Sequence, residues 1–208
     1  MRVKRMILKL MKILSESVLP VFFWTLLIFA FDAPYIAILT MISAAAHEAG
    51  HIISILFLGG RLEIPRGHVS GFRIRRSSTL AYGREIIILL AGPLTNVLVF
   101  SIAIMLIPIF DGYAVAFAII NAATAISNML PIEGYDGYGI LFQIFSSRGL
   151  SRALLILEYC SFLITVCFTF FSLYLLDKFG SGYWIFAMFF CMMIAKLTKF
   201  GKFNVFCE

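Results

Sequence analysis

Long apolar runs dominate this sequence and constrain its fold more than any other feature. Hydrophobic residues make up 62% of the chain and charged residues only 13%, whereas a soluble domain has about 25% charged residues. So little charge cannot cover a water-facing surface, which excludes a soluble globular protein, a disordered chain and a disulfide scaffold. We therefore expect an all-α polytopic membrane protein in contact with the lipid bilayer, with no nucleic-acid partner despite its net charge of +6.

Six apolar runs predict membrane-spanning helices, since one crossing needs about 20 apolar residues, although the first and last runs are short. The predicted crossings are Ser17–Phe31, Pro34–Leu58, Ile86–Phe110, Tyr113–Pro131, Ala153–Leu176 and Gly182–Ala195. Every Lys and Arg except Lys178 then falls on one side of the membrane. Short loops rich in these residues stay in the cytoplasm. We expect a multi-pass cell-membrane protein with both termini cytoplasmic and residues 1–208 forming one domain.

Three ionisable residues inside the second predicted crossing form an HExxH motif. His47 and His51 are four positions apart, so both rings lie on one helix face and can bind the same metal ion. Glu48 is displaced around the helix and can act on a water bound to that ion. Zinc lowers the pKa of such a water to about 7, and a carboxylate can take its proton as the hydroxide attacks a carbonyl. Because ionisable groups in a membrane span are costly, the motif predicts a metal site.

Catalytic zinc needs a third protein ligand, and the end of the fourth predicted crossing offers candidates. Pro131 cannot continue a helix, so we expect extended backbone after it. Glu133 and Asp136 both lie there, and their spacing does not choose between them. Asn128, on the last helical turn, can hydrogen-bond a substrate carbonyl or a neighbouring helix. Both halves of the predicted site lie toward the inner ends of their crossings, which places it near the cytoplasmic leaflet.

Small and polar residues inside the third and fourth predicted crossings indicate close helix contacts. Gly92 lets a neighbouring helix approach and Pro93 bends its own helix. Asn96 can bridge to the second or the fourth crossing. Asn121 and Thr124 are expected to form hydrogen bonds between helices.

The motifs together resemble the signatures of the site-2 proteases, zinc metalloproteases that cut peptide bonds within or beside the membrane. The family signatures HExxH and NxxPxxxxDG correspond to His47–His51 and Asn128–Gly137, and Ala91–Asn96 resembles a GPxxN stretch in the intervening helix. Over roughly residues 17–200, the order and layout are most similar to the subgroup that includes the sporulation sigma-factor-processing proteases. The family commonly continues DGG, whereas Gly137 is followed here by Tyr138, and we expect no appended regulatory domain.

This resemblance implies a function and a role for each site residue. One Zn²⁺ ion per chain is bound by His47, His51 and Asp136, Glu48 is the catalytic base, and Asn128 positions or polarises the scissile carbonyl. The implied activity is a zinc-dependent intramembrane endopeptidase, which hydrolyses a peptide bond in or near a transmembrane or membrane-tethered segment of a protein substrate. A regulatory membrane protein is a further partner that this activity suggests.

The resemblance also implies a three-helix catalytic core, at about residues 34–145. The basic loop that follows its first helix, residues 59–84, alternates polar and apolar residues at Arg61–Ile64 and Phe72–Arg75, which predicts a short membrane-associated β-rich segment. An edge strand there can pair with an unwound substrate, or the loop can rest on anionic lipid headgroups.

Two other functions stay open on the sequence. A prenyl-processing-type membrane metalloprotease takes its third ligand from a glutamate on a later helix, for which Glu158 is available. A non-proteolytic membrane metal-binding or metal-transport protein would use the same histidines and Asp136 without needing Glu48.

Overall fold

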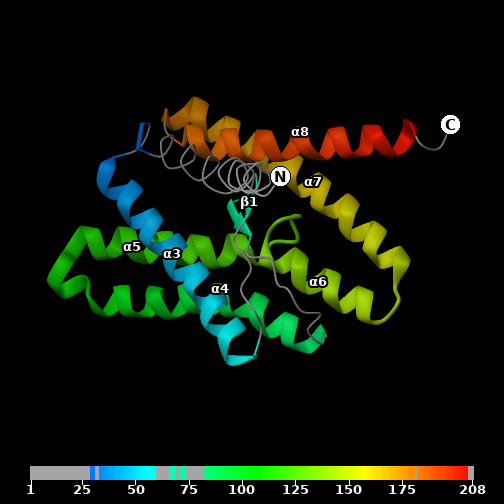
Figure 1. Ribbon diagram of the computed structural model, residues 1–208. Coiled ribbons are helices and arrows are strands. Elements are labelled where there is room, and N and C mark those ends of the chain that lie inside the picture. The colour runs from blue at the N-terminus through cyan, green and yellow to red at the C-terminus, as the bar shows by residue number, and fades with distance from the viewer. Residues whose placement is uncertain are drawn as a thin grey trace, which may run out of the picture. The chain divides into compact units, whose positions relative to one another are not determined.

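A computed structural model of the chain describes residues 29–30, 33–59, 66–68, 71–73, 82–180 and 182–205 (Figure 1). Within these ranges, four helices are long and apolar enough to cross a membrane. They are α3 (Pro34–Phe57), α4 (Tyr82–Met105), α5 (Ile107–Asn128) and α7 (Ser151–Phe179). Two further helices are α6 (Asp136–Ser147) and α8 (Tyr183–Val205), and α8 has a shorter apolar stretch, Tyr183–Thr198.

The described residues thus agree with the prediction of a helical membrane protein. The predicted number of six crossings stays a prediction. The predicted first crossing, Ser17–Phe31, lies outside the described residues except for residues 29–30, which are helical. The described chain divides into two compact units. The core unit contains α3 to α6 and the start of α7, through Glu158, and the second unit contains two short strands, the rest of α7 and α8.

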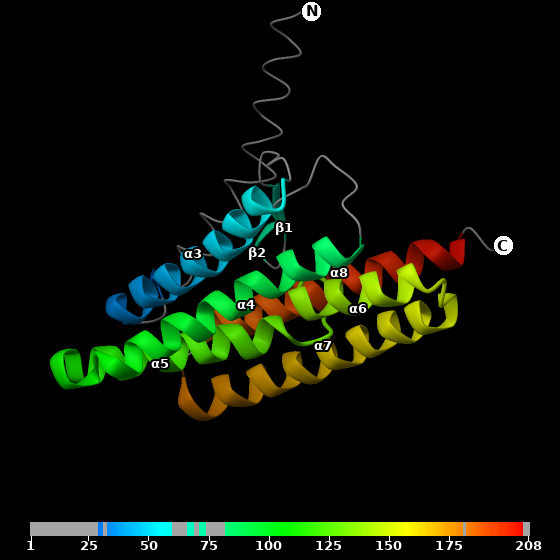
Figure 2. The ribbon, with the colours of Figure 1, turned by 90° about the horizontal axis from the view of Figure 1, so that it is seen from below.

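In the core unit, α4 packs against α3, α5 and α6, and α3 crosses the pair formed by α4 and α5 (Figures 1 and 2). The third predicted crossing, Ile86–Phe110, ends five residues later than the helix that corresponds to it. The helix α4 stops at Met105, and α5 begins two residues later with a proline in its first positions, where the missing N–H costs nothing. A second break follows at Asp111, whose φ of 42° is left-handed.

The segment between α5 and α6 has the non-helical backbone that Pro131 predicts. Gly134 takes a φ of 106° there, which a residue with a side chain rarely adopts. The chain then forms α6, a helix that the sequence reasoning did not predict. A Cβ on Gly137 would collide with the backbone carbonyl of Met129, so this glycine lets the first turn of α6 fold back against the end of α5. Asp136, the first residue of α6, is positioned by this turn.

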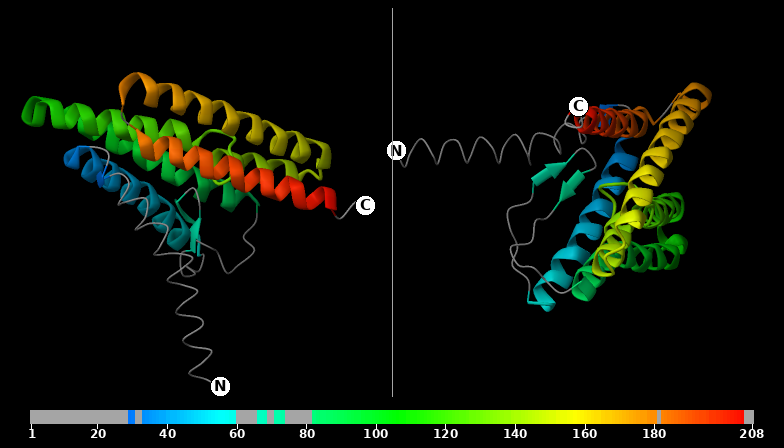
Figure 3. Two further views of the ribbon diagram at one scale, coloured as in Figure 1. Left: turned by 90° about the horizontal axis from the view of Figure 1, so that it is seen from above. Right: turned by 90° about the vertical axis from the view of Figure 1, so that its right-hand side faces the viewer.

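The two strands of the second unit are β1 (Arg66–His68) and β2 (Gly71–Arg73), which pair antiparallel with Gly67 opposite Phe72 (Figure 3). They lie in the loop for which short strands were predicted. Of the two predicted segments, Phe72–Arg75 overlaps β2, while Arg61–Ile64 lies outside the described residues. Contact of this loop with the membrane stays a prediction.

Helices α7 and α8 meet within the second unit. The rings of Phe168 and Phe189 stack with centroids 5.2 Å apart, and the Lys196 ammonium donates a hydrogen bond to the Ser161 hydroxyl. The predicted last crossing, Gly182–Ala195, ends earlier than α8 does, and Lys196, the residue after that predicted end, is buried against α7.

Candidate metal centre

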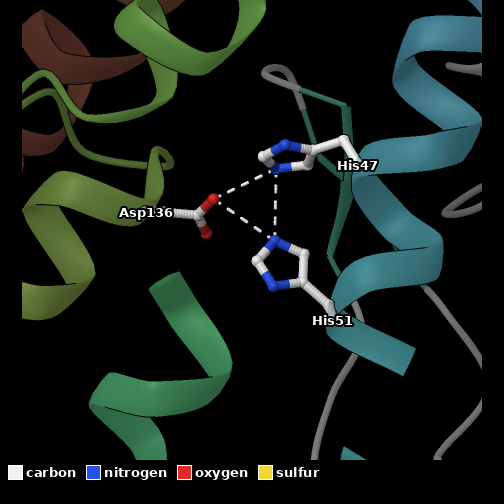
Figure 4. A group of neighbouring side chains, drawn as sticks. All are labelled: His47, His51 and Asp136. Atoms are coloured by element: carbon white, nitrogen blue, oxygen red, sulfur yellow. Dashed lines mark hydrogen bonds and ion pairs between the residues drawn. The ribbon is translucent and has the colours of Figure 1, made fainter. Parts of the chain in front are cut away.

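Two helices bring three potential metal ligands together in the core unit (Figure 4). His47 and His51 project from successive turns of α3, and Asp136 faces them from the start of α6. The Oδ2 atom of Asp136 lies 3.0 Å from Nε2 of His47 and 3.2 Å from Nε2 of His51. The two Nε2 atoms are 3.2 Å apart. One ligand atom from each residue therefore faces a shared point.

The other nitrogen of each ring is held by an oxygen. Nδ1 of His47 lies 2.7 Å from Oδ1 of Asn96, and Nδ1 of His51 lies 2.7 Å from the backbone oxygen of Ile88. An amide or backbone oxygen can only accept a hydrogen bond, so each Nδ1 donates and carries the ring proton. In a neutral imidazole the lone pair is then at Nε2, which is the arrangement that metal-binding histidines require.

The Oδ2 atom of Asp136 faces these lone pairs and is buried. Within the part of the chain that the structure describes, it has no hydrogen-bond partner. Three electron-rich atoms at these distances repel one another unless a cation lies between them. In a tetrahedral zinc site with bonds of about 2.0–2.1 Å, neighbouring ligand atoms are about 3.3 Å apart. The observed separations of 3.0–3.2 Å match that value within a few tenths of an ångström, so the cluster can hold a metal ion.

The carboxylate is prepared for this role electrostatically. Burial by itself would raise the pKa of Asp136, but when His47 and His51 are protonated their hydrogen bonds and charges outweigh burial and lower the pKa below its ordinary value. A cation held between the three residues would favour the ionised carboxylate in the same way, in place of the ring protons. Burial raises the pKa of the neighbouring Tyr135 to about 12, so that side chain stays neutral and adds no second negative charge.

Helix α4 passes so close to the two rings that only glycine fits at one position. A Cβ on Gly92 would lie against Nε2 of His51 and 2.7 Å from Cε1 of His47. Close packing also occurs at Gly50, where a Cβ would lie 2.7 Å from the backbone oxygen of Ala91. The expected close approach at Gly92 is thus confirmed, and the helix that it meets, α3, carries His47 and His51.

Adding one methyl group at this point is expected to disturb the centre without breaking the helix. In Gly92→Ala the new Cβ pushes the His51 ring out of line, and we expect zinc affinity to fall at least about tenfold, as for changes in groups that orient ligands. Gly83→Ala is the matched control, because its Cβ would meet nothing within 4 Å. Zinc competition with a fluorescent chelator measures both variants, and equal affinities would contradict the steric argument.

The other predicted residues lie as follows. Glu48 is half-buried on α3 and interacts electrostatically with both histidines and with Asp136. Asn128 is also half-buried, and its Nδ2 atom donates to the backbone oxygen of Thr124 over 2.9 Å. The catalytic roles of these two residues stay predictions.

Of the two carboxylates left open at the end of the fourth crossing, the structure brings Asp136 and not Glu133 into the cluster. Glu158, the candidate for an alternative third ligand, is also outside it.

Two supporting groups were missed by the sequence reasoning. Ser43 is fully buried and shares the network around Asn96, and it lies four residues before His47, so helical spacing could have revealed it. The backbone oxygen of Ile88 has no residue-specific signal. The bridging role expected for Asn96 is confirmed, since it contacts His47 on α3 and Asn121 on α5.

No protein-family model matches the chain, and no curated protein matches it.

Proposed function

We propose that the protein is a zinc-dependent intramembrane endopeptidase of the site-2 protease type. The observation that carries this proposal is the convergence of His47, His51 and Asp136 beside Glu48. The two histidines and Glu48 lie on α3, a helix apolar enough to cross a membrane. The proposed family assignment rests on the HExxH and NxxPxxxxDG motifs, in which these four residues occupy the matching positions. Hydrolytic chemistry explains why an apolar helix carries three ionisable residues that are costly in lipid.

Zinc is the proposed ion, one per chain. Two imidazole nitrogens and one carboxylate oxygen are the ligand types of catalytic zinc, which keeps a fourth position open. A bound zinc ion supplies Lewis acidity, polarising a water molecule and a peptide carbonyl.

Within this proposal, the chain's own residues move the proton and hold the substrate. Glu48 accepts the proton of the attacking water and passes it to the leaving amine, for which its place beside both histidines and Asp136 is suited. The Nδ2 atom of Asn128 carries two N–H groups. One donates to Thr124, and the second can donate to the carbonyl of the scissile peptide.

We further propose the membrane arrangement that the basic residues predict. It has six crossings, both termini in the cytoplasm and the site near the cytoplasmic leaflet, where water reaches a buried peptide bond by a short path. The substrate is a membrane-spanning or membrane-tethered protein, and a regulatory membrane protein is a proposed partner.

A comparison of membrane proteomes tests the proposal. Cells that produce the native protein and cells that produce Glu48→Gln are compared for full-length and truncated membrane proteins. We expect a small set of proteins to accumulate uncut with Glu48→Gln, because the centre still binds zinc but lacks its base. Glu133→Gln makes the same chemical change at a carboxylate outside the cluster and should match the native pattern. Identical proteomes in all three would overturn the proposal.

A non-proteolytic metal-binding or metal-transport protein is the second candidate, because it would use the same three ligands. A prenyl-processing-type protease is less well supported, since Glu158 is not in the cluster.

A further inference from the structure

Behind the metal-facing side of His47, polar side chains from three helices form a buried chain of hydrogen bonds. Its members are Ser43 on α3, Asn96 on α4 and Asn121 on α5, and all three are fully buried. Polar groups buried among apolar helices are costly unless each is satisfied, so their orientations are mutually dependent. The orientation of each side chain can be derived in turn, starting from Asn121 on α5 and ending at His47 on α3.

The first step sets the amide of Asn121. Its Nδ2 atom donates to the backbone oxygen of Phe117 over 2.8 Å. A backbone oxygen can only accept, so a flipped amide would place two oxygens against each other. The Oδ1 atom of Asn121 therefore points toward α3 and α4, where it accepts from Asn96 over 2.9 Å and from the Ser43 hydroxyl over 3.0 Å.

The second step sets the amide of Asn96. Its Nδ2 atom donates to Oδ1 of Asn121 and to the backbone oxygen of Ser43, 3.1 Å away. The reverse orientation would put the Asn96 oxygen against these two acceptors, where it would be repelled, and would lose both hydrogen bonds. Hence Oδ1 of Asn96 faces Nδ1 of His47, at 2.7 Å.

The third step sets the proton of His47. Because an amide oxygen accepts only, the His47 proton is held at Nδ1 and the lone pair at Nε2, facing Asp136. His51 needs no such chain. Its Nδ1 atom donates to the backbone oxygen of Ile88, which cannot exchange places with a donor as a side-chain amide can.

We propose that Asn121 and Asn96 are positioning residues that hold the His47 proton at Nδ1 and so keep Nε2 available to the metal ion. This inference rests on the proposed metal binding but not on peptidase activity. It assigns Asn121, which touches neither histidine, a role in metal affinity.

Zinc affinity of the purified full-length protein tests the proposal, measured by competition with a chelator. We expect Asn96→Leu to weaken zinc binding about 10- to 100-fold, the usual effect of removing a group that orients a histidine ligand. Asn121→Leu removes one hydrogen bond further away and should weaken it about 2- to 10-fold. Thr165→Val is the control, because it removes a fully buried hydroxyl that donates to the backbone oxygen of Ser161 in its own helix, within the second unit.

Asn96→Asp separates orientation from packing. One carboxyl oxygen still accepts the proton of Nδ1, and the other, when protonated, donates to Oδ1 of Asn121, so zinc affinity should recover above that of Asn96→Leu. If the amide served only packing, the apolar leucine would bind zinc at least as well as the aspartate variant. Zinc binding by Asn96→Leu that is as tight as that of Asn96→Asp would overturn the proposal. So would a zinc affinity of Asn121→Leu equal to that of the native protein.

The histidine tautomers give a further readout, and in the native protein it does not depend on any variant folding. The chain has three histidines, so ¹⁵N-histidine labelling yields the Nδ1 and Nε2 signals of three imidazole rings. In the zinc-free native protein, at a pH where the rings are neutral, we expect His47 as the Nδ1–H form, and a mixture with Nε2–H in Asn121→Leu. A native His47 protonated at Nε2 overturns the inference. A native protein that binds no zinc overturns the proposed function instead.

Discussion

Replacing Asp136 with alanine is expected to lower zinc affinity by more than about 100-fold, beyond the loss that follows from removing a group that only orients a ligand. The variant loses one of three protein ligands. It also leaves the Nε2 atoms of His47 and His51, 3.2 Å apart, without the negative charge that offsets a cation between them. Zinc content after purification and chelator competition measure the loss.

Glu133→Ala provides the matched control, because it removes a carboxylate three residues away that is outside the cluster. This variant should keep native zinc content. Equal loss in both variants would indicate that the loop between α5 and α6 has collapsed rather than that a ligand is missing. Retention of native affinity by Asp136→Ala would contradict the assignment of the third ligand.

Replacing Glu48 with glutamine is expected to separate metal binding from hydrolysis. Glutamine has nearly the same size but cannot take a proton from water, and a general base contributes about 10²- to 10⁴-fold to a rate. We expect cleavage to fall at least about 100-fold while one zinc ion per chain remains bound. The measurement is cleavage of a substrate protein reconstituted in the same lipid vesicles as the variant, with zinc quantified in each sample.

Glu158→Gln makes the same change in α7 and should cleave at the native rate. Native-like cleavage by zinc-loaded Glu48→Gln would refute the peptidase mechanism. Zinc transport across the vesicle membrane by both the native protein and Glu48→Gln, with no cleavage of the substrate protein, would support the metal-transport alternative. Loss of zinc in Glu158→Gln alone would favour the prenyl-processing type.

Helical periodicity made half of the candidate metal site predictable. His47 and His51 are four residues apart, so any helix through them places both rings on one face, whatever the rest of the chain does. Asn96 was expected to bridge helices because a polar residue in an apolar helix needs a partner. These inferences depend on local geometry, which a sequence pattern specifies directly.

Contacts between distant segments were harder to predict. Spacing could not choose between Glu133 and Asp136, because both follow Pro131 in irregular backbone. The choice depends on the tight turn in which Gly137 lies against Met129 and α6 begins. The helix α6 itself and the early end of α4 were missed, since a break inside a long apolar stretch changes the composition very little.

The sequence alone therefore determined that this is a helical membrane protein and which helix face carries two imidazoles, because composition and the 3.6-residue period act locally. The motif resemblance named Asp136 as the third ligand, but only the tertiary structure brings its carboxylate to the two imidazoles. Tertiary packing also forms the hydrogen bonds from Asn121 through Asn96 that orient His47. Both results require side chains from different helices to meet within about 3 Å, and such distances follow from packing rather than from any residue's position in the chain.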